Sequence, residues 1–330
     1  MRNFLALFIA RNREFYRDKG SLSWSLLFPL ILIFGLNFAL SNDKYIYKMG
    51  VIGNQDLPRA AAQIPYVEKI HYADRELALK RLRQHELDLV VSGGTGEYWI
   101  NPAAKKSFFL EQSLRQTGVP LIRHTVTGMD VSYVAWLVPG ILSMSLMFSC
   151  LYGVGYVITR YRNMGVLKRY HATPISALEF LGAQMASRLL ITVSTLSVVF
   201  SGAYGLLHFP LNGSPWLLLL VAICGALAMI SLSLVLAARI DSLELMNGLL
   251  NLLSWPMMFL SGLWFSLDGA PQILQDISRA MPLTHVVEPA RAIMLEGAGW
   301  NEVFPHLAIL LAITLVLMTA ATRLFRWESA

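Results

Sequence analysis

Long apolar runs constrain this chain more than any other feature of its sequence. A helix of about 20 mostly apolar residues crosses the hydrocarbon core of a bilayer. Runs that approach or exceed this length predict spans at residues 22–40, 133–158, 178–207, 215–238, 243–263 and 303–324. Only 15% of the 330 residues are charged, whereas a soluble domain carries about a quarter. The sequence therefore predicts a mainly α-helical protein with six transmembrane helices.

Two further regions are predicted around the first apolar run. Residues 1–20 place aromatic and aliphatic side chains on one helical face and basic residues, Arg11 among them, elsewhere. This pattern is typical of an amphipathic helix that lies at the membrane interface before the first span, residues 21–41. Residues 42–129 carry most of the charge, and their alternating strand-like and helix-like segments predict a small α/β domain.

Helical segments are expected both inside the α/β domain and after it. Residues 74–85 form an amphipathic helix with Asp74 as its N-cap. Residues 102–126 read as one long helix that leads back to the membrane, where residues 130–330 hold the remaining spans. Within that part, residues 267–297 are too polar to span and too apolar for a free loop. They predict two short re-entrant helices on the outer side, between the fifth and sixth spans.

The distribution of basic residues predicts the orientation of the spans. Arginine and lysine cluster before the first span and after the second, whereas residues 208–215 contain neither. Short cytoplasmic loops carry the excess of positive charge, so both termini are predicted to be cytoplasmic and the α/β domain extracytoplasmic. The net charge of +6 is explained by this topology, and nucleic acid is not an expected partner.

Motifs for catalysis and coupled transport are absent from the sequence. It contains no GxxxxGK[ST], HExxH or GxSxG pattern. Cys150 and Cys224 lie in apolar runs, and no histidine pair has metal-ligand spacing on a helix. Glu179 and Arg188 stand near the start of the third span, where they are expected to extend to the cytoplasmic face. A proton-coupled carrier, a charged-ring channel and a metal site are therefore not predicted, and the energy for any transport must come from elsewhere.

One polar segment between the second and third spans, "RYRNMGVLKRYHATPIS", combines cations with a helix stop. Residues 160–171 can form a short helix along the cytoplasmic face. Pro174 restrains Thr173 away from helical angles before the next span begins. A short cationic helix of this kind can contact a cytoplasmic partner, but a solvated loop that only fixes the orientation explains the charges equally well.

This segment resembles a motif of the ABC-2 type exporter permeases, R-x-x-G-x-L-(K/R)-x(4)-T-P-(I/L/V)-S. A second stretch, "FLSGLWFSLDGAPQILQDISRAMPLTHVVEPARAIML", resembles the family's outer block, with Ser266 where the family often has proline. The α/β insert after the first span resembles that of the branch with a longer insert. The two motifs stand in the expected order, and the resemblance covers essentially the whole chain.

The resemblance implies a permease subunit without a catalytic site, located in a bacterial inner membrane. Its implied partners are two cytoplasmic ATP-binding cassette subunits and a second copy of itself or a related permease. A periplasmic adaptor is a further partner that the outer domain could contact. ATP and Mg would bind to the ATPase subunits, and this chain would bind neither a cofactor nor a metal.

The resemblance also assigns roles to three groups of residues. A coupling helix at residues 160–174, with secondary contacts in the other cytoplasmic loop, would dock on the ATPase through Arg160, Arg162, Gly165, Leu167, Lys168, Arg169, Thr173, Pro174, Asp241 and Glu244. An exit gate on the outer side would include Ser261, Gly262, Pro282, Leu283, Thr284 and His285. A substrate route between the second and fifth spans would be lined by Met144, Met147, Phe148, Met246, Asn247, Asn251, Met257 and Met258, although ordinary packing explains these side chains slightly better.

The scarcity of charge inside the spans favours an amphipathic cargo, such as a drug-like compound, a lipid or a glycolipid. Export of a polysaccharide through an aromatic-lined channel is an alternative within the same family. A sensor or assembly protein that uses the outer domain and moves nothing is the alternative from another class of function.

Overall fold

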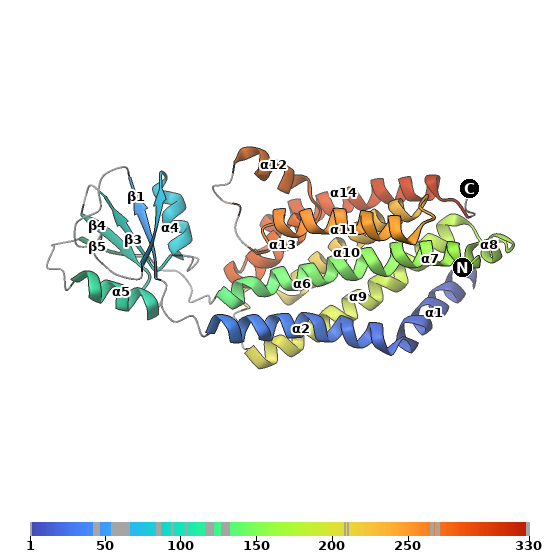
Figure 1. Cartoon of the computed structure of the whole chain (residues 1–330), viewed down its shortest axis with the longest axis horizontal. Helices are drawn as coiled ribbons and strands as arrows, with labels where there is room; N and C mark the ends of the chain where they lie inside the picture. The colour runs from blue at the N-terminus through green and yellow to red at the C-terminus, as the bar shows by residue number, and fades with distance from the viewer. Residues whose placement is uncertain are drawn as a thin grey trace. The chain divides into compact units, whose positions relative to one another are not determined.

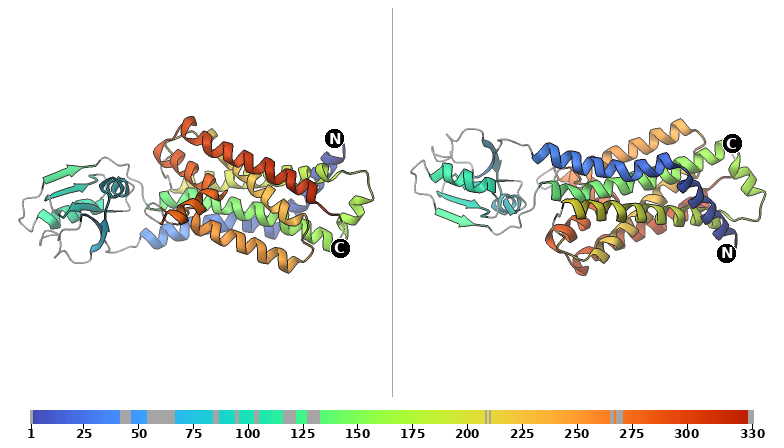
Figure 2. Two further views of the ribbon diagram at one scale, coloured as in Figure 1. Left: turned by 90° about the horizontal axis from the view of Figure 1, so that it is seen from above. Right: turned by 90° about the horizontal axis from the view of Figure 1, so that it is seen from below.

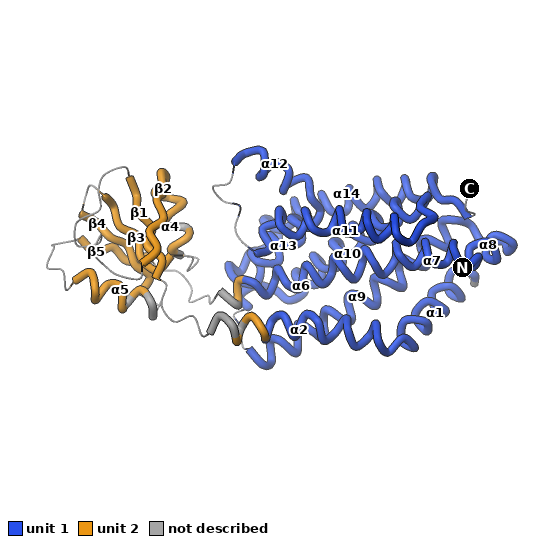
Figure 3. Tube along the Cα trace, in the orientation of Figure 1, with its two compact units in different colours: residues 1–34, 137–330 blue, residues 35–136 orange. Residues whose placement is uncertain are grey.

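The structure is a computed structural model that describes residues 2–41, 47–53, 67–83, 87–93, 96–102, 105–115, 122–126, 133–207, 209, 211–264, 267 and 271–327. Two compact units divide the chain (Figure 3). One contains residues 1–34 and 137–330 and is helical, and the other contains residues 35–136 and carries the sheet. Ser266, the departure from the family's outer block, lies outside the described residues.

The helical unit is built from long helices that run side by side (Figures 1 and 2). Its elements are α1 (Arg2–Arg17), α2 (Lys19–Ser41), α6 (Tyr133–Leu151), the π-helical η1 (Tyr152–Tyr156), α7 (Val157–Asn163), α8 (Val166–His171), α9 (Ala177–Leu207), α10 (Pro215–Ala237), α11 (Leu243–Leu260), α12 (Gln272–Ala280), α13 (Thr284–Arg291), the π-helical η2 (Ala292–Glu296) and α14 (Trp300–Leu324). Both ends of the described chain lie at the same end of this unit as α8 (Figure 1). We call this end the α8 end.

Five helices among the described residues are long and apolar enough to cross a membrane. They are α2, the continuous α6–η1–α7 helix, α9, α10 and α14. The helix α11, predicted as the fifth of six spans, has 18 residues but includes Glu244, Asn247 and Asn251, and it is not among these five. The prediction of a mainly helical chain is confirmed, and five of its six spans have the required length and hydropathy.

The helix α10 forms the centre of the helical unit, where it packs against α9, α13, α14 and η1. Small side chains on α10 allow this close packing. A Cβ added at Gly225 would lie 2.5 Å from Cγ2 of Val286 on α13. Small residues at helix contacts are the usual means of close packing where no water drives the helices together.

The sheet unit has five strands in the order β2–β1–β3–β4–β5. The strands are β1 (Tyr47–Ile52), β2 (Val67–Tyr72), β3 (Leu89–Ser92), β4 (Glu97–Ile100) and β5 (Ile122–Thr125), and the helices are α4 (Arg75–Arg83) and α5 (Lys105–Arg115). Only the β3–β4 pair is antiparallel among the described strand pairs. Leu89 and Val91 pack with α5, whereas Val90 between them packs with α4. One helix therefore covers each face, and the predicted small α/β fold is confirmed.

Of the local predictions for this unit, the helix cap is confirmed and the long second helix is wrong. Asp74 caps α4 as predicted, since its Oδ1 accepts a hydrogen bond from the Glu76 backbone N–H at 3.0 Å. Residues 84–85 of the predicted helix lie outside the described residues. The single helix predicted at 102–126 is wrong, because α5 ends at Arg115 and residues 122–125 form β5, which pairs in parallel with β4. The β-branched residues of β5 gain backbone partners from β4, which outweigh helix propensity in so short a segment.

Candidate functional site

A left-handed glycine separates α7 from α8 at the α8 end. Gly165 has φ +69°, and no atom of another part of the chain lies within 4 Å of the position that a Cβ would take. Glycine is therefore required here by the backbone angle and not by lack of space. The turn allows α8 to leave the direction of the α6–η1–α7 helix.

Arg162 joins three segments of the chain at the α8 end. Its guanidinium donates hydrogen bonds to the carbonyl oxygens of Ile240 at 2.5 Å, Ala238 at 3.2 Å and Arg326 at 2.9 Å. Its Nε lies 3.5 Å from Oδ1 of Asp241. The side chain is only 5% exposed, so Arg162 and Asp241, both predicted to contact an ATPase, hold α7, the α10–α11 loop and the C-terminal residues together.

The apolar side of α8 faces the core of this chain. Leu167 is fully buried in the main hydrophobic cluster, so in this structure it anchors α8 to its own unit and presents no surface to a partner. His171 stacks on Trp327 with ring centroids 5.6 Å apart, and Trp327 also packs against Phe180 of α9. The opposite side of this segment is exposed and carries Arg160, Lys168, Arg169, Thr173 and Pro174.

The Thr-Pro-Ile-Ser sequence ends α8 and begins α9. The Thr173 hydroxyl donates to the Tyr170 carbonyl at 2.6 Å. The Ser176 hydroxyl accepts from the Glu179 backbone N–H at 3.2 Å, and the Glu179 carboxylate accepts from the Ser176 backbone N–H at 3.1 Å. This reciprocal pair is a capping box. The sequence interpretation missed it, although the Ser-x-x-Glu spacing signals it.

Asp241 lies in the second loop at the α8 end, and Glu244 lies in the first turn of α11. Ser242 caps α11, because its hydroxyl accepts from the Leu245 backbone N–H at 3.2 Å. The same hydroxyl donates to the exposed Glu244 carboxylate at 2.8 Å. The structure thus brings the two predicted coupling segments to one end, with Arg162 and Asp241 as their direct contact.

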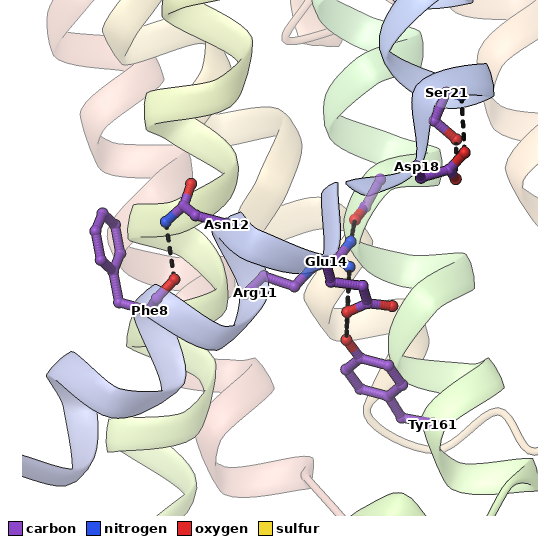
Figure 4. A network of polar contacts seen from close by, with 8 residues as sticks. Phe8, Arg11, Asn12, Glu14, Asp18, Ser21 and Tyr161 are labelled. Atoms are coloured by element: carbon purple, nitrogen blue, oxygen red, sulfur yellow. Dashed lines mark hydrogen bonds and ion pairs between the residues drawn. The ribbon is translucent and has the colours of Figure 1, made fainter. Parts of the chain in front are cut away.

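The helix α1 is attached to the helical unit by polar contacts that the sequence did not reveal (Figure 4). Arg11 donates to Glu14 at 2.9 Å and to the Gly153 carbonyl of η1 at 3.0 Å, and Tyr161 of α7 also binds Glu14. Asp18 caps α2, with Ser21 as donor of hydrogen bonds that lower the pKa of the Asp18 carboxyl. Arg11 was predicted on the solvated face of an interfacial helix, but it is buried, because α1 packs on α9.

The predicted exit-gate residues form the framework of two short helices, α12 and α13. The Thr284 hydroxyl donates to the Ser278 carbonyl at 2.7 Å. His285 binds the Arg279 carbonyl through Nε2 at 2.8 Å and His306 of α14 through Nδ1 at 3.0 Å. Leu283 is fully buried, and Pro282 is half-buried.

The end of α11 is tied to the same framework. Ser261 is buried, and Gly262 turns the chain with φ +68°. Arg291 donates to the Gly262 carbonyl at 3.0 Å. The predicted gate residues therefore do lie together, and in this structure they fasten α11, α12, α13 and α14 to one another.

Most predicted route residues are core residues in this conformation. The buried members of the main hydrophobic cluster include Met144, Met147, Met246, Met257 and Met258. Phe148 and Asn247 are half-buried, and Asn251 is exposed. The Tyr152 hydroxyl donates to Asn251 Oδ1 at 2.8 Å, which connects η1 to α11.

A stripe on α11 faces away from the core. It is exposed and mostly apolar, and we define the α11 stripe as Leu245, Gly248, Leu252, Trp255 and Phe259. The spacing of three or four residues puts these side chains on one face of the helix.

Arg188 does not extend to the cytoplasmic face as predicted. It is 8% exposed, and its Nη2 donates to the Ser149 hydroxyl of α6 at 2.7 Å. A Cβ added at Gly153 would overlap the Arg188 guanidinium, so the glycine in η1 makes room for it. The prediction failed because the side chain turns toward α6 inside the unit rather than along α9.

No group of three or more metal-ligating side chains is found among the described residues. Within the same part of the chain, Cys150 and Cys224 are buried free thiols.

Comparisons with known proteins agree on the kind of protein. A family model described as ABC-2 family transporter protein matches residues 19–323. The inner membrane transport permease YhhJ of Escherichia coli (strain K12) is 32% identical over 174 residues, which are 52% of this chain and 46% of that protein. Nodulation protein J of Rhizobium meliloti (strain 1021) is 27% identical over 201 residues, 59% of this chain and 74% of that protein.

A third relative carries a drug-related name. The probable multidrug ABC transporter permease YbhR of Escherichia coli (strain K12) is 20% identical over 201 residues, 60% of this chain and 54% of that protein. The match to YhhJ, like that to YbhR, spans about half the length of the relative.

Proposed function

This chain belongs to the ABC-2 family of transporter proteins and is a transmembrane permease, and we propose that it is the membrane subunit of an ATP-driven exporter in a bacterial inner membrane. Two cytoplasmic ATP-binding cassette subunits would supply the energy and bind ATP and Mg. A second copy of the chain, or a related permease, would complete the membrane part. The name of YhhJ, an inner membrane transport permease, supports the location.

In this proposal α11 also crosses the membrane, as the fifth of six spans, and the α8 end is cytoplasmic. The polar residues of α11, which are Glu244, Asn247 and Asn251, would face a second subunit or the substrate route instead of lipid. The α11 stripe, exposed in the single chain, would then be covered in the assembled transporter. Both chain ends lie at the α8 end with the cationic segment 160–169 (Figure 1), which supports a cytoplasmic placement by the distribution of positive charge. The α/β unit would then be extracytoplasmic.

The observation that carries the proposal is the way in which α8 is attached to the rest of the helical unit. Its outer side exposes Lys168 and Arg169, and its inner side is fixed by the buried Leu167. The Gly165 turn connects it to α7, and the Ser176 capping box connects it to α9. A partner that pushes on α8 would therefore move α7 and α9 together, since only residues 164–165 separate α8 from α7 and only residues 172–176 separate it from α9.

The test is copurification of an ATP-binding subunit with the tagged full-length chain from membranes of its native host. Lys168→Glu combined with Arg169→Glu should remove the ATP-binding subunit from the complex, because the exposed charge is reversed without disturbing the core. Arg323→Glu is the matched control, as it reverses an exposed cation on α14. Equal amounts of the subunit with both variants would refute α8 as the docking site.

The surface pair is a better test than a change at Leu167. Because Leu167 is fully buried, Leu167→Asp would place a charge in the core and unfold this end of the unit. Loss of the ATP-binding subunit would then have two explanations.

The cargo that fits this proposal is amphipathic: a drug-like compound, a lipid or a glycolipid. The described spans are apolar, and the printed name of YbhR refers to multidrug transport. In proteoliposomes containing the complete complex, such compounds should stimulate ATP hydrolysis. Stimulation by a soluble polysaccharide alone would favour the polysaccharide alternative and contradict this cargo class.

A further inference from the structure

A cavity of about 560 Å³ lies inside the helical unit, between the α1–α2 turn, the α6–η1–α7 helix and α9. Its polar wall includes Ser149, Tyr152, Arg188 and Thr192. The predicted coupling, gate and route groups do not account for these polar residues. The cavity lies within one chain, so it does not require a second subunit to be formed.

Arg188 is a buried cation in this cavity, and no anionic partner for it is found in the part of the chain that the structure describes. Its hydrogen bond is to the Ser149 hydroxyl, which in turn lies 2.9 Å from the Thr192 hydroxyl. No carboxylate among the described residues lies within 4.0 Å of it, and its Nε is buried without a partner. A charge within a membrane span is costly unless it is paired, and such a residue marks a site by default.

The other charged groups around the cavity are already satisfied. Arg11 is paired with Glu14 at 2.9 Å, and the Asp18 carboxylate accepts two hydrogen bonds from Ser21 (Figure 4). Arg160 also lines the cavity. The three arginines of the lining stand against two carboxylates, those of Glu14 and Asp18, so one positive charge is in excess, and an acidic group on Arg188 could neutralise it.

The rest of the cavity is apolar and continues along α9. Trp24 and Phe28 of α2 stack with ring centroids 5.5 Å apart, and Phe148 of α6 faces the same space. A second cavity of about 310 Å³, lined mainly by apolar residues that include Leu142 and Phe200, shares Leu196 with the first. The cavity with the polar wall and the second, mainly apolar cavity thus adjoin at Leu196.

The order of these features along α9 matches the orientation of a lipid. With a rise of about 1.5 Å per residue, Arg188 stands about 17 Å from the start of α9, and Leu196 lies about 12 Å further from the α8 end. If the α8 end is cytoplasmic, as proposed above, a ligand with its acidic group on Arg188 and its chain along Leu196 has the orientation of an inner-leaflet lipid.

We propose that the cavity binds the acidic headgroup of an amphiphile, with the phosphate or carboxylate on Arg188 and the acyl chain between Phe28, Phe148 and Leu196. The chemical class is an anionic phospholipid or a similar amphipathic acid. A charge-assisted hydrogen bond from a buried guanidinium is the strong kind, and apolar burial of the chain adds to it.

The experiment measures lipid binding to the purified full-length chain by native mass spectrometry. The probes are dioleoylphosphatidylglycerol, dioleoylphosphatidylcholine and inorganic phosphate. We expect the phosphatidylglycerol adduct to be favoured over phosphatidylcholine by about tenfold, which corresponds to about 1.4 kcal/mol. Arg188→Gln should reduce this preference to about twofold or less, whereas Arg188→Lys should retain most of it.

Two further variants separate binding from folding. Thr195→Phe fills the cavity and leaves Arg188 in place, so it should weaken the adduct in a chain that melts normally. Arg323→Gln removes an exposed cation at the α8 end and should leave the preference unchanged. An unchanged lipid preference in Arg188→Gln, or an undiminished adduct in Thr195→Phe, would overturn the proposal. Equal binding of the two lipids by the wild type would also overturn it. Displacement of the lipid by inorganic phosphate at equal concentration would assign the site to a small anion and would contradict an amphiphile as its ligand.

This experiment contains neither ATP nor an ATP-binding subunit. A failure of transport would therefore leave its result intact, and a failure of lipid binding would leave the α8 docking proposal intact.

Discussion

Replacement of Arg162 by methionine should destabilise the α8 end far more than any change on the surface of α8. The guanidinium of Arg162 binds three backbone carbonyls, and the side chain is 5% exposed. Arg162→Met fills much of the volume but leaves these carbonyls without a donor. Each buried unsatisfied group costs about 1–3 kcal/mol. Because water reaches this end of the unit, Arg162→Met should lower the free energy of unfolding by about 3–5 kcal/mol. This is the range for the loss of one partner of a buried pair.

The contribution of Asp241 to the same contact should be small. Its side chain is 38% exposed, and the Nε–Oδ1 distance is 3.5 Å. Exposed ion pairs contribute about 0–1 kcal/mol. Asp241→Asn should therefore cost at most about 1 kcal/mol, although it removes the only carboxylate that the structure pairs with Arg162 in the described residues.

Thermal unfolding of the full-length chain in detergent distinguishes these two cases. At about 2–4 °C per kcal/mol for a unit of this size, Arg162→Met should lower the Tm by about 6–20 °C and Asp241→Asn by less than about 4 °C. Arg160→Met is the control, since Arg160 is exposed two residues earlier on the same helix. Equal shifts for Arg162→Met and Arg160→Met would refute the interpretation of Arg162 as a joint between segments.

Further predictions concern separate contacts. Gly165→Ala should cost about 1–2 kcal/mol, because φ +69° strains any residue with a Cβ, as the same melting assay would show. Ser176→Ala should cost about 1 kcal/mol through loss of the α9 cap, with Ser197→Ala, an exposed serine within α9, as the control. Burial, followed by Glu111, raises the pKa of Tyr98, so the stability that its neutral hydroxyl provides is present below the ordinary value of about 10 and declines as the pH rises through the raised value. Tyr98→Phe should abolish that alkaline decline, measured by tryptophan fluorescence of the full-length chain.

The sequence revealed features that repeat over many residues. Five spans follow from long apolar runs, and the alternation of strands with helices predicted the α/β fold. The N-cap role of Asp74 was predicted from a local rule that needs only residues close in sequence. The strand β5 was missed because its pairing partner β4 lies more than twenty residues away in the chain. A four-residue strand has too few residues to show a period of its own.

In the candidate site, too, the sequence revealed local features and not those that depend on packing. The helix stop before Pro174 was visible in the sequence, because proline restrains the residue that precedes it. The break at Gly165 was missed, since residues 160–171 were predicted as one helix and the structure ends α7 at Asn163 and begins α8 at Val166. Whether a cation is buried was not visible. Arg162 and Arg188 resemble Lys168 and Arg169 in type and in location near a span end, yet the first two lie inside the unit and the other two outside. Only the packing of α7 and α9 against their neighbours decides which arginine meets carbonyl oxygens and which meets water.

This division changes the physical meaning of the motif at residues 162–176. Its members with fixed spacing mostly point inward or set the backbone. Arg162 binds the α10–α11 loop and the C-terminal residues, Gly165 sets the turn, Leu167 anchors α8 and Ser176 caps α9. The outward positions, Lys168 and Arg169, specify only charge. The residues with fixed spacing therefore attach α8 firmly to α7 and α9, and the two cations form its exposed surface. A force on α8 is therefore transmitted to the spans on both sides. If α8 moved while α7 and α9 stayed in place, the turn, the cap and the buried guanidinium contacts would all break.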